Sequence, residues 1–177
     1  MTPDSGAPDT VGRLLAGRGD IGRVAAAYEL AIESGNREEA PKAALFLGRL
    51  RERQGDPAGA AAAYRLAIHS GHVDAAPEAA LHLGLLREEQ GDPAGAAAAF
   101  QLAIHFGHAD AAPKAAVQLG VLRAGQGDPV GAAAAYQFAI DSGPADAAPR
   151  AALFLGGLRE EQGDHVGAAV VFQLAIR

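Results

Sequence analysis

The chain has 177 residues and is 49% hydrophobic but only 5% aromatic, because most of its apolar residues are alanine and leucine. Its formal net charge is −6, with 15 basic and 21 acidic residues interspersed, so there is no basic stripe that could neutralise a nucleic-acid backbone. The absence of cysteine excludes disulfides and thiolate metal sites.

The N-terminal stretch MTPDSGAPDT has neither a basic start nor an apolar core, so it predicts no signal peptide. We expect residues 1–8 to form a flexible tail. No run in the sequence approaches the roughly 18 apolar residues that a membrane span requires. The expectation is therefore a soluble, cytoplasmic protein with no membrane partner and no nucleic-acid partner.

From residue 9 onward the sequence repeats itself every 36 residues. The segment QGDPAGAAAA begins at Gln54 and again at Gln90, and near copies begin at Gln126 and Gln162. A fixed period in this range without insertions indicates a solenoid, and the lack of period-two alternation argues against strands. We predict an all-α superhelix of stacked helical hairpins, about ten helices in one domain over residues 9–177. The expected units are about 9–36, 37–72, 73–108, 109–144 and 145–177.

Each unit is predicted to hold two antiparallel helices, as residues 73–108 illustrate. Asp74 is expected to cap the first helix, which ends at Gly91, where a left-handed backbone is favoured. Asp92 then caps the second helix, with Pro93 in its first position, and Gly107 ends it. The alanine-rich faces let the two helices approach closely. Neighbouring units must stack, because one hairpin cannot bury its apolar faces alone.

The spacing of small and aromatic residues resembles the tetratricopeptide repeat family. Leu47-Gly48 is followed by Ala60, Tyr64 and Ala67, which lie 12, 16 and 19 residues after the glycine. The same set recurs three times: Gly84, Ala96, Phe100 and Ala103; Gly120, Ala132, Tyr136 and Ala139; Gly156, Ala168, Phe172 and Ala175. The resemblance implies a right-handed superhelix whose concave face, lined mainly by the first helices, binds peptides or partner proteins.

The sequence departs from that family in two respects. Its period is 36 where the family's usual period is about 34, and an arginine replaces the aromatic residue that the family favours three residues after the glycine. The segments SGHVDAA and FGHADAA also resemble the related Sel1-like repeats. The arginines recur in every full unit, so we expect them to pair with local carbonyls or the capping aspartate: Arg51, Arg87, Arg123 and Arg159.

Carrying the family's groove onto this sequence gives four positions on one side of each first helix. They differ between units, as positions that meet a ligand would. These candidate groove residues are Lys42, Leu45, Phe46 and Arg49; Glu78, Leu81, His82 and Leu85; Lys114, Val117, Gln118 and Val121; and Arg150, Leu153, Phe154 and Gly157.

A groove of this composition has an apolar floor and a mainly basic edge, which suits an amphipathic helix or an extended apolar segment. The lysine and asparagine of the family's carboxylate clamp are absent from these positions, so recognition of a chaperone tail is not expected. The alternative is that the apolar residues among them pack against the neighbouring unit and line no groove.

The histidines His69 and His72, and their counterparts His105 and His108, form two HxxH pairs. Two imidazoles at this spacing can bind a metal on one helix face. Gly71 interrupts the first pair at the helix end, however, and a histidine near a helix C-terminus is already favoured by the helix dipole. We therefore predict no metal site and no cofactor, while the sequence leaves metal binding by these pairs open.

No catalytic constellation is present, and GDPAG lacks the lysine and serine or threonine of a phosphate loop. An enzyme is not expected. The leading hypothesis is a scaffold whose groove binds a peptide or partner helix. A second is self-assembly through an uncapped C-terminal helix, since a solenoid normally ends in a helix with a polar outer face. The residues proposed for that contact are Val170, Val171 and Leu174. A third is a subunit that senses a ligand for a separate effector.

Overall fold

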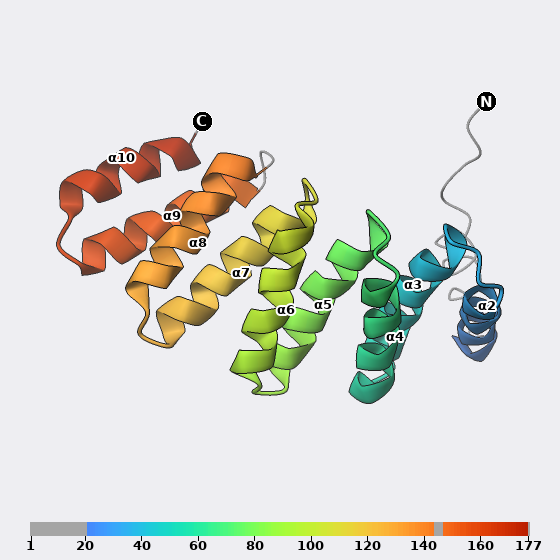
Figure 1. The fold of residues 1–177 in the computed structure, drawn as a ribbon. Helices are drawn as coiled ribbons and strands as arrows, with labels where there is room; N and C mark the ends of the chain where they lie inside the picture. The colour runs from blue at the N-terminus through green and yellow to red at the C-terminus, as the bar shows by residue number, and fades with distance from the viewer. Residues whose placement is uncertain (1–20, 144–146, 177) are drawn as a thin grey trace, which may run out of the picture. The chain divides into compact units, whose positions relative to one another are not determined.

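The computed structural model describes residues 21–143 and 147–176, and these are all-α: they form nine helices and contain no strand (Figure 1). The all-α fold class expected from the repeat is confirmed. The predicted tail at residues 1–8 and a tenth helix would lie outside the described residues. By its internal contacts the chain divides into two compact units, Met1–Leu83 and Gly84–Arg177.

The first compact unit is built around helix α3. Helices α2 (Ile21–Glu33) and α4 (Pro57–His69) both pack against α3 (Glu39–Arg53), and the unit ends within α5 (Ala75–Glu89). Its core is the set Val24, Ala25, Tyr28, Ala43, Leu47, Leu50 and Ala63. Small residues alternate with a few large ones here, so the helices are held at close range by alanine contacts.

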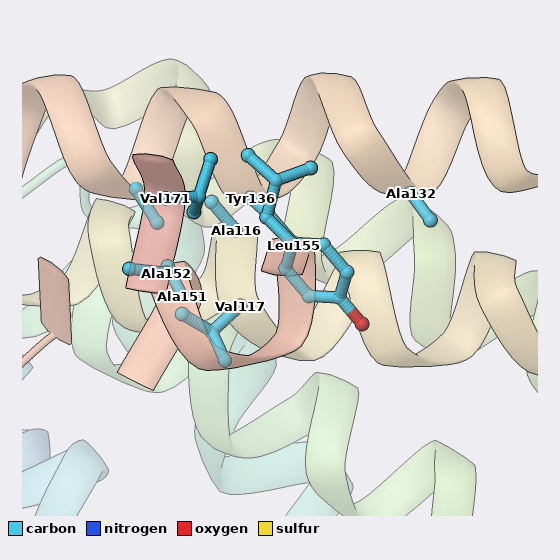
Figure 2. Packing of buried hydrophobic residues seen from close by; sticks show 9 residues of the cluster. Ala116, Val117, Ala132, Tyr136, Ala151, Ala152, Leu155 and Val171 are labelled. Carbon is cyan, nitrogen blue, oxygen red and sulfur yellow. The ribbon is translucent and has the colours of Figure 1, made fainter. Parts of the chain in front are cut away.

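The second compact unit contains five further helices, each packed against the next. They are α6 (Pro93–Phe106), α7 (Ala111–Gly125), α8 (Pro129–Ser142), α9 (Ala147–Glu161) and α10 (His165–Ala175). Helix α7 also contacts α9. Figure 2 shows the shared core, in which Val117, Tyr136 and Leu155 lie among alanines and Val171.

The corner between the two helices of a hairpin forms as the sequence predicts. In the QGD corners the glycine has a left-handed backbone, with φ between 71° and 81°. The aspartate that follows accepts a hydrogen bond from the backbone N–H of the glycine three residues later, as Asp56 does from Gly59. A Cβ at Gly59 would overlap the Asp56 carboxylate. The second glycine of GDPAG is therefore required by the cap.

The cap itself can be tested at Asp128, whose side chain accepts from the backbone N–H of Gly131 at 2.8 Å. We expect Asp128→Ala to lower the free energy of unfolding by about 1 kcal/mol, because the first turn of α8 loses its acceptor. Asp128→Asn should cost much less, since asparagine is an equally good cap. Urea titration followed by circular dichroism measures both, and an equal loss in the two variants would contradict a capping role.

The arginines that recur in every full unit contact the same corner, as expected. Arg51 and Arg87 reach the capping carboxylates of Asp56 and Asp92, at 3.3 and 3.5 Å. In the next two units Nη1 of the arginine donates instead to a carbonyl in the first turn of the second helix, as Arg123 does to Gly131 at 3.2 Å. The structural interpretation of these arginines is confirmed.

The first helix of each unit is capped differently from the prediction. Nδ1 of His72 accepts from the backbone N–H groups of Asp74 and Ala75, and His108 makes the same pair of bonds before α7. Asp110, at the position for which the sequence predicts a capping aspartate, makes no side-chain cap bond. The capping side chain therefore lies two residues earlier than predicted, because the amides of the second and third residues after it point back toward its ring.

Candidate functional site

Side chains of the first helices stack on buried aromatic rings of the second helices. The Phe46 ring lies 6.0 Å from that of Tyr28, and the His82 ring lies 5.6 Å from that of Tyr64, nearly parallel at 13°. In the second compact unit Phe154 stacks on Tyr136 at 5.6 Å. Three predicted groove residues therefore form the outer layer of two-ring stacks, which fixes their orientation.

His82 is a strongly perturbed titratable group of the first compact unit. Burial, reinforced by the nearby Arg49 guanidinium, lowers the pKa of His82 to about 4. At neutral pH its ring is uncharged, with one nitrogen that donates and one that accepts. Arg49 itself is exposed. A neutral ring on a buried tyrosine thus lies close to an exposed cation.

Tyr64, on which His82 stacks, is held in place by burial and by a hydrogen bond from its hydroxyl. It is fully buried, and its hydroxyl donates to Oε2 of Glu52. Burial, together with this hydrogen bond, raises the pKa of Tyr64 far above its usual value. The His82 ring therefore stacks on an immobile, neutral tyrosine, and Arg49 is near enough to affect its protonation.

Lys42, predicted for the basic edge of the groove, is engaged in an ion pair. Its ammonium lies 2.5 Å from Oε1 of Glu38, and only 14% of its side chain is exposed. His72 Nε2 approaches the other oxygen of Glu38 at 3.2 Å. The hydrogen bonds from Lys42 and His72 hold the pKa of Glu38 below its usual value. Arg49 is thus the more accessible groove cation of this unit.

Two of the predicted groove residues belong to the core. Leu45 is 5% exposed, and Val117 is 2% exposed within the cluster around Tyr136. Burial supports the alternative prediction, packing against a neighbouring unit, at these two positions, because a ligand could not reach either side chain. Glu78, Leu81, Leu85, Gln118 and Val121 are half-buried.

Helix α9, the first helix of the C-terminal unit, exposes more of its predicted groove residues than the first helices of the other units do. Leu153 is 56% and Phe154 39% exposed, and the Arg150 guanidinium lies 5.8 Å from the centre of the Phe154 ring. Lys114, on α7, is exposed too. The accessible part of the predicted groove in the second compact unit therefore centres on Arg150, Leu153 and Phe154.

The residues predicted for self-association separate into two kinds. Val170 and Leu174 are 58% and 42% exposed, but Val171 is 4% exposed and packs in the core cluster (Figure 2). Val171 cannot contact a partner, because its side chain faces α8 and α9. Val170 and Leu174 remain candidates.

Both histidines of the first HxxH pair hydrogen-bond to backbone groups. Nδ1 of His69 lies 2.6 Å from the carbonyl oxygen of Arg65, while Nδ1 of His72 accepts from two amides. In the described part of the chain no group of three or more histidine, aspartate or glutamate side chains is arranged to hold a metal ion. The capping role of His72 was not predicted from the sequence, although Asn36, a typical capping residue, occupies the same repeat position.

Comparisons with known proteins agree with this architecture. A family model described as tetratricopeptide repeat matches residues 12–75, 71–116 and 117–177. No curated protein is detectably similar in sequence. Among solved structures, one titled crystal structure of MamA protein is 22% identical, with a TM-score of 0.69, and the match covers 97% of this chain and 90% of that one.

Two further solved structures share the fold. BtubC (BKLC) from P. vanneervenii is 17% identical with a TM-score of 0.75, and the match covers 98% of this chain and 80% of that one. PilW, titled a widely conserved type IV pilus biogenesis factor, is 19% identical with a TM-score of 0.66, covering 99% and 77%. Sel1-like character stays a prediction. No helix within residues 21–143 and 147–176 has the length and apolar content to cross a bilayer. With family-model matches along nearly its whole length, the chain belongs to the tetratricopeptide repeat family.

Proposed function

We propose that the chain is a protein-interaction scaffold that binds an apolar segment of a partner, either an extended peptide or one side of a helix, on the outer faces of its first helices. Its family membership supports a scaffold in general terms. The observation that carries the finer proposal is the stack of His82 on Tyr64 beside the exposed Arg49. A flat uncharged ring with a cation next to it favours an apolar residue flanked by an acidic one.

The charge distribution supports the same partner. The chain has a formal net charge of −6, but the exposed charges among its candidate groove residues are the cations Arg49, Lys114 and Arg150, and the single acid, Glu78, is half-buried. An exposed basic group on the outer side of a first helix, in a chain that is acidic as a whole, steers acidic partners to that helix. The proposed role involves no catalysis and no cofactor.

The experiment uses synthetic amphipathic peptides that differ only in whether glutamate or lysine flanks the apolar residues. We expect the protein to prefer the glutamate series, and we expect Arg49→Glu to weaken that series on the order of ten-fold while improving the lysine series. Arg65→Glu, which changes an exposed arginine on α4 of the same compact unit, is the matched control. Fluorescence anisotropy provides the affinities, and identical binding by wild type and Arg49→Glu would rule out this face.

A second candidate function is structural self-assembly through the C-terminal repeat. The observation that favours it is the character of α10, which contains no lysine, arginine, aspartate or glutamate. It nevertheless exposes Val166, Val170 and Leu174. An uncharged helix with exposed apolar residues in a chain of net charge −6 is better suited to a protein contact than to water.

A further inference from the structure

The outer side of α9 presents a stripe of four residues that the core does not use: Arg150, Leu153, Gly157 and Glu160. Their spacing of three, four and three residues places them on one side of the helix. Ala151, Ala152 and Leu155 lie on the opposite side and pack in the core cluster with α7 and α8. The stripe therefore faces away from the rest of its own compact unit.

On α7, in the same compact unit, the fold covers the middle of the corresponding stripe, whereas Lys114 and Ala124 at its ends are exposed. On α7 the position of Leu153 is held by Val117, which is 2% exposed, in a cluster with Ala151 and Ala152 of α9. Leu153 is 56% exposed, and no described residue covers it. The same contrast holds for Ile140, which packs against the cluster, and its counterpart Ile176, which is 85% exposed. This face of α9 and α10 has the character of an interface between repeats.

Gly157 gives the stripe a shape that no other unit has. Its counterparts are Arg49, Leu85 and Val121. A Cβ added at Gly157 would meet nothing within 4 Å, so the helix surface there is open. One turn away, Leu153 projects as an exposed apolar side chain. The stripe thus places an exposed leucine one turn from an open glycine surface, an arrangement that is complementary to a second copy of itself related by a two-fold axis.

The charges at the two ends of the stripe are opposite. Consider two copies of α9 that pair antiparallel about a two-fold axis passing at the level of Leu155. Each residue then lies opposite the residue of the second copy whose number, added to its own, gives 310. Arg150 then faces Glu160 of the second copy, and Leu153 faces its Gly157, and each contact occurs twice. Arg150 and Glu160 are both exposed and available for such pairs. A parallel arrangement would set like charges against each other at both ends.

We propose that two copies of this chain associate through the outer side of α9, antiparallel about a two-fold axis, with Leu153 of each copy packed over Gly157 of the other. This deepens the second candidate function and does not depend on peptide binding at Arg49. The exposed residues Val170, Leu174 and Ile176 of the α10 region flank the contact and extend its apolar area.

The test is sedimentation velocity of the 177-residue chain over a concentration series. We expect a monomer–dimer equilibrium for wild type and a loss of association of at least ten-fold in Leu153→Arg. Leu66→Arg is the matched control, because Leu66 is 55% exposed, against 56% for Leu153, but lies on α4. Circular dichroism checks that both variants keep their helices. A wild type that is monomeric throughout, or a Leu153→Arg variant that associates like wild type, would overturn the proposal.

Charge exchange tests the two-fold register. Arg150→Glu should weaken the dimer on the order of ten-fold because it places glutamate opposite Glu160, and the double variant R150E/E160R should restore it. Failure of the double variant to restore association overturns the antiparallel register, and growth into species larger than a dimer would indicate head-to-tail stacking instead. Arg49→Glu, on α3 of the other compact unit, should weaken peptide binding but associate like wild type, so the two proposals fail separately.

Discussion

Gly120→Ala is expected to lower the free energy of unfolding by about 1–3 kcal/mol, even though alanine is the better helix former. A Cβ at this position would overlap the ring of Tyr136. That ring is 2% exposed and is enclosed by the cluster around Leu155 shown in Figure 2, so it has no room to move. Protein interiors are packed as densely as organic crystals, and one additional methyl group therefore forces side chains off their preferred rotamers.

The same helix supplies the matched control. Gly125 also lies in α7, and a Cβ there would meet nothing within 4 Å. Gly125→Ala should therefore raise the free energy of unfolding by up to about 1 kcal/mol, because only helix propensity changes. Urea titration of both variants by circular dichroism measures the difference. If Gly120→Ala proved as stabilising as Gly125→Ala, the close approach of α7 and α8 at this glycine would be wrong.

The recurring glycines show which part of the fold was predictable. Gly91, Asp92 and Pro93 each act through their own backbone or through an amide three residues away, so their letters alone locate the end of one helix and the start of the next. The helix bounds follow from such local rules, repeated four times. The Leu-Gly pair was recognised by its spacing, but its reason, a ring seated on the glycine, is a contact between two helices.

The candidate site was less predictable for the same reason. Periodicity identifies the side of a helix on which Val117 and Leu153 lie, and in the sequence the two positions are equivalent. Val117 is buried and Leu153 is exposed, because exposure depends on whether a neighbouring unit covers that side of the helix. No pattern within a single helix contains this information. Lys42 is a similar case, since its ion pair with Glu38 removes it from a groove to which its position assigns it.

The capping histidines illustrate a further limit. The sequence places His72 three residues after His69, a spacing that suits a metal on one helix face. In the structure the chain turns between them, so that His72 serves the next helix while His69 stays on the previous one. The equivalent residue Asn36 carried the signal, because asparagine at that repeat position has a common local use as a cap and none as a soft-metal ligand.

The positions that depart from the repeat are where the two proposed contacts lie. His82 occupies the place of Phe46 and Phe154, and it brings a titratable ring next to Arg49. Gly157 occupies the place of Arg49 and opens a hollow beside Leu153. Scaffold positions are constrained to be the same in every unit, whereas a contact with a partner need only exist once. Irregularity in this array is therefore the better guide to function.

His82 is expected to make the protein acid-sensitive. Its pKa is about 4 when folded, lowered first by burial and then by Arg49, from an ordinary value of 6.5. The unfolded chain therefore binds a proton more readily than the folded one between these values. The stability that the neutral ring contributes is fully present above pH 6.5 and is lost as the pH falls toward 4. The difference between the two pKa values corresponds to about 3 kcal/mol of folding stability, of which about 2 kcal/mol is lost by about pH 5.

Replacing the ring should remove this dependence. His82→Gln uses the residue that Gln118 supplies at the same repeat position, and it cannot take up a proton. We expect the free energy of unfolding, from urea titrations at about pH 7.5 and about pH 5, to fall by about 2 kcal/mol less in this variant than in wild type. His69→Gln, at an exposed histidine on α4, is the control and should keep the wild-type difference. An identical pH dependence in His82→Gln and wild type would mean that His82 is protonated in the folded state, and the neutral ring beside Arg49 would then be wrong.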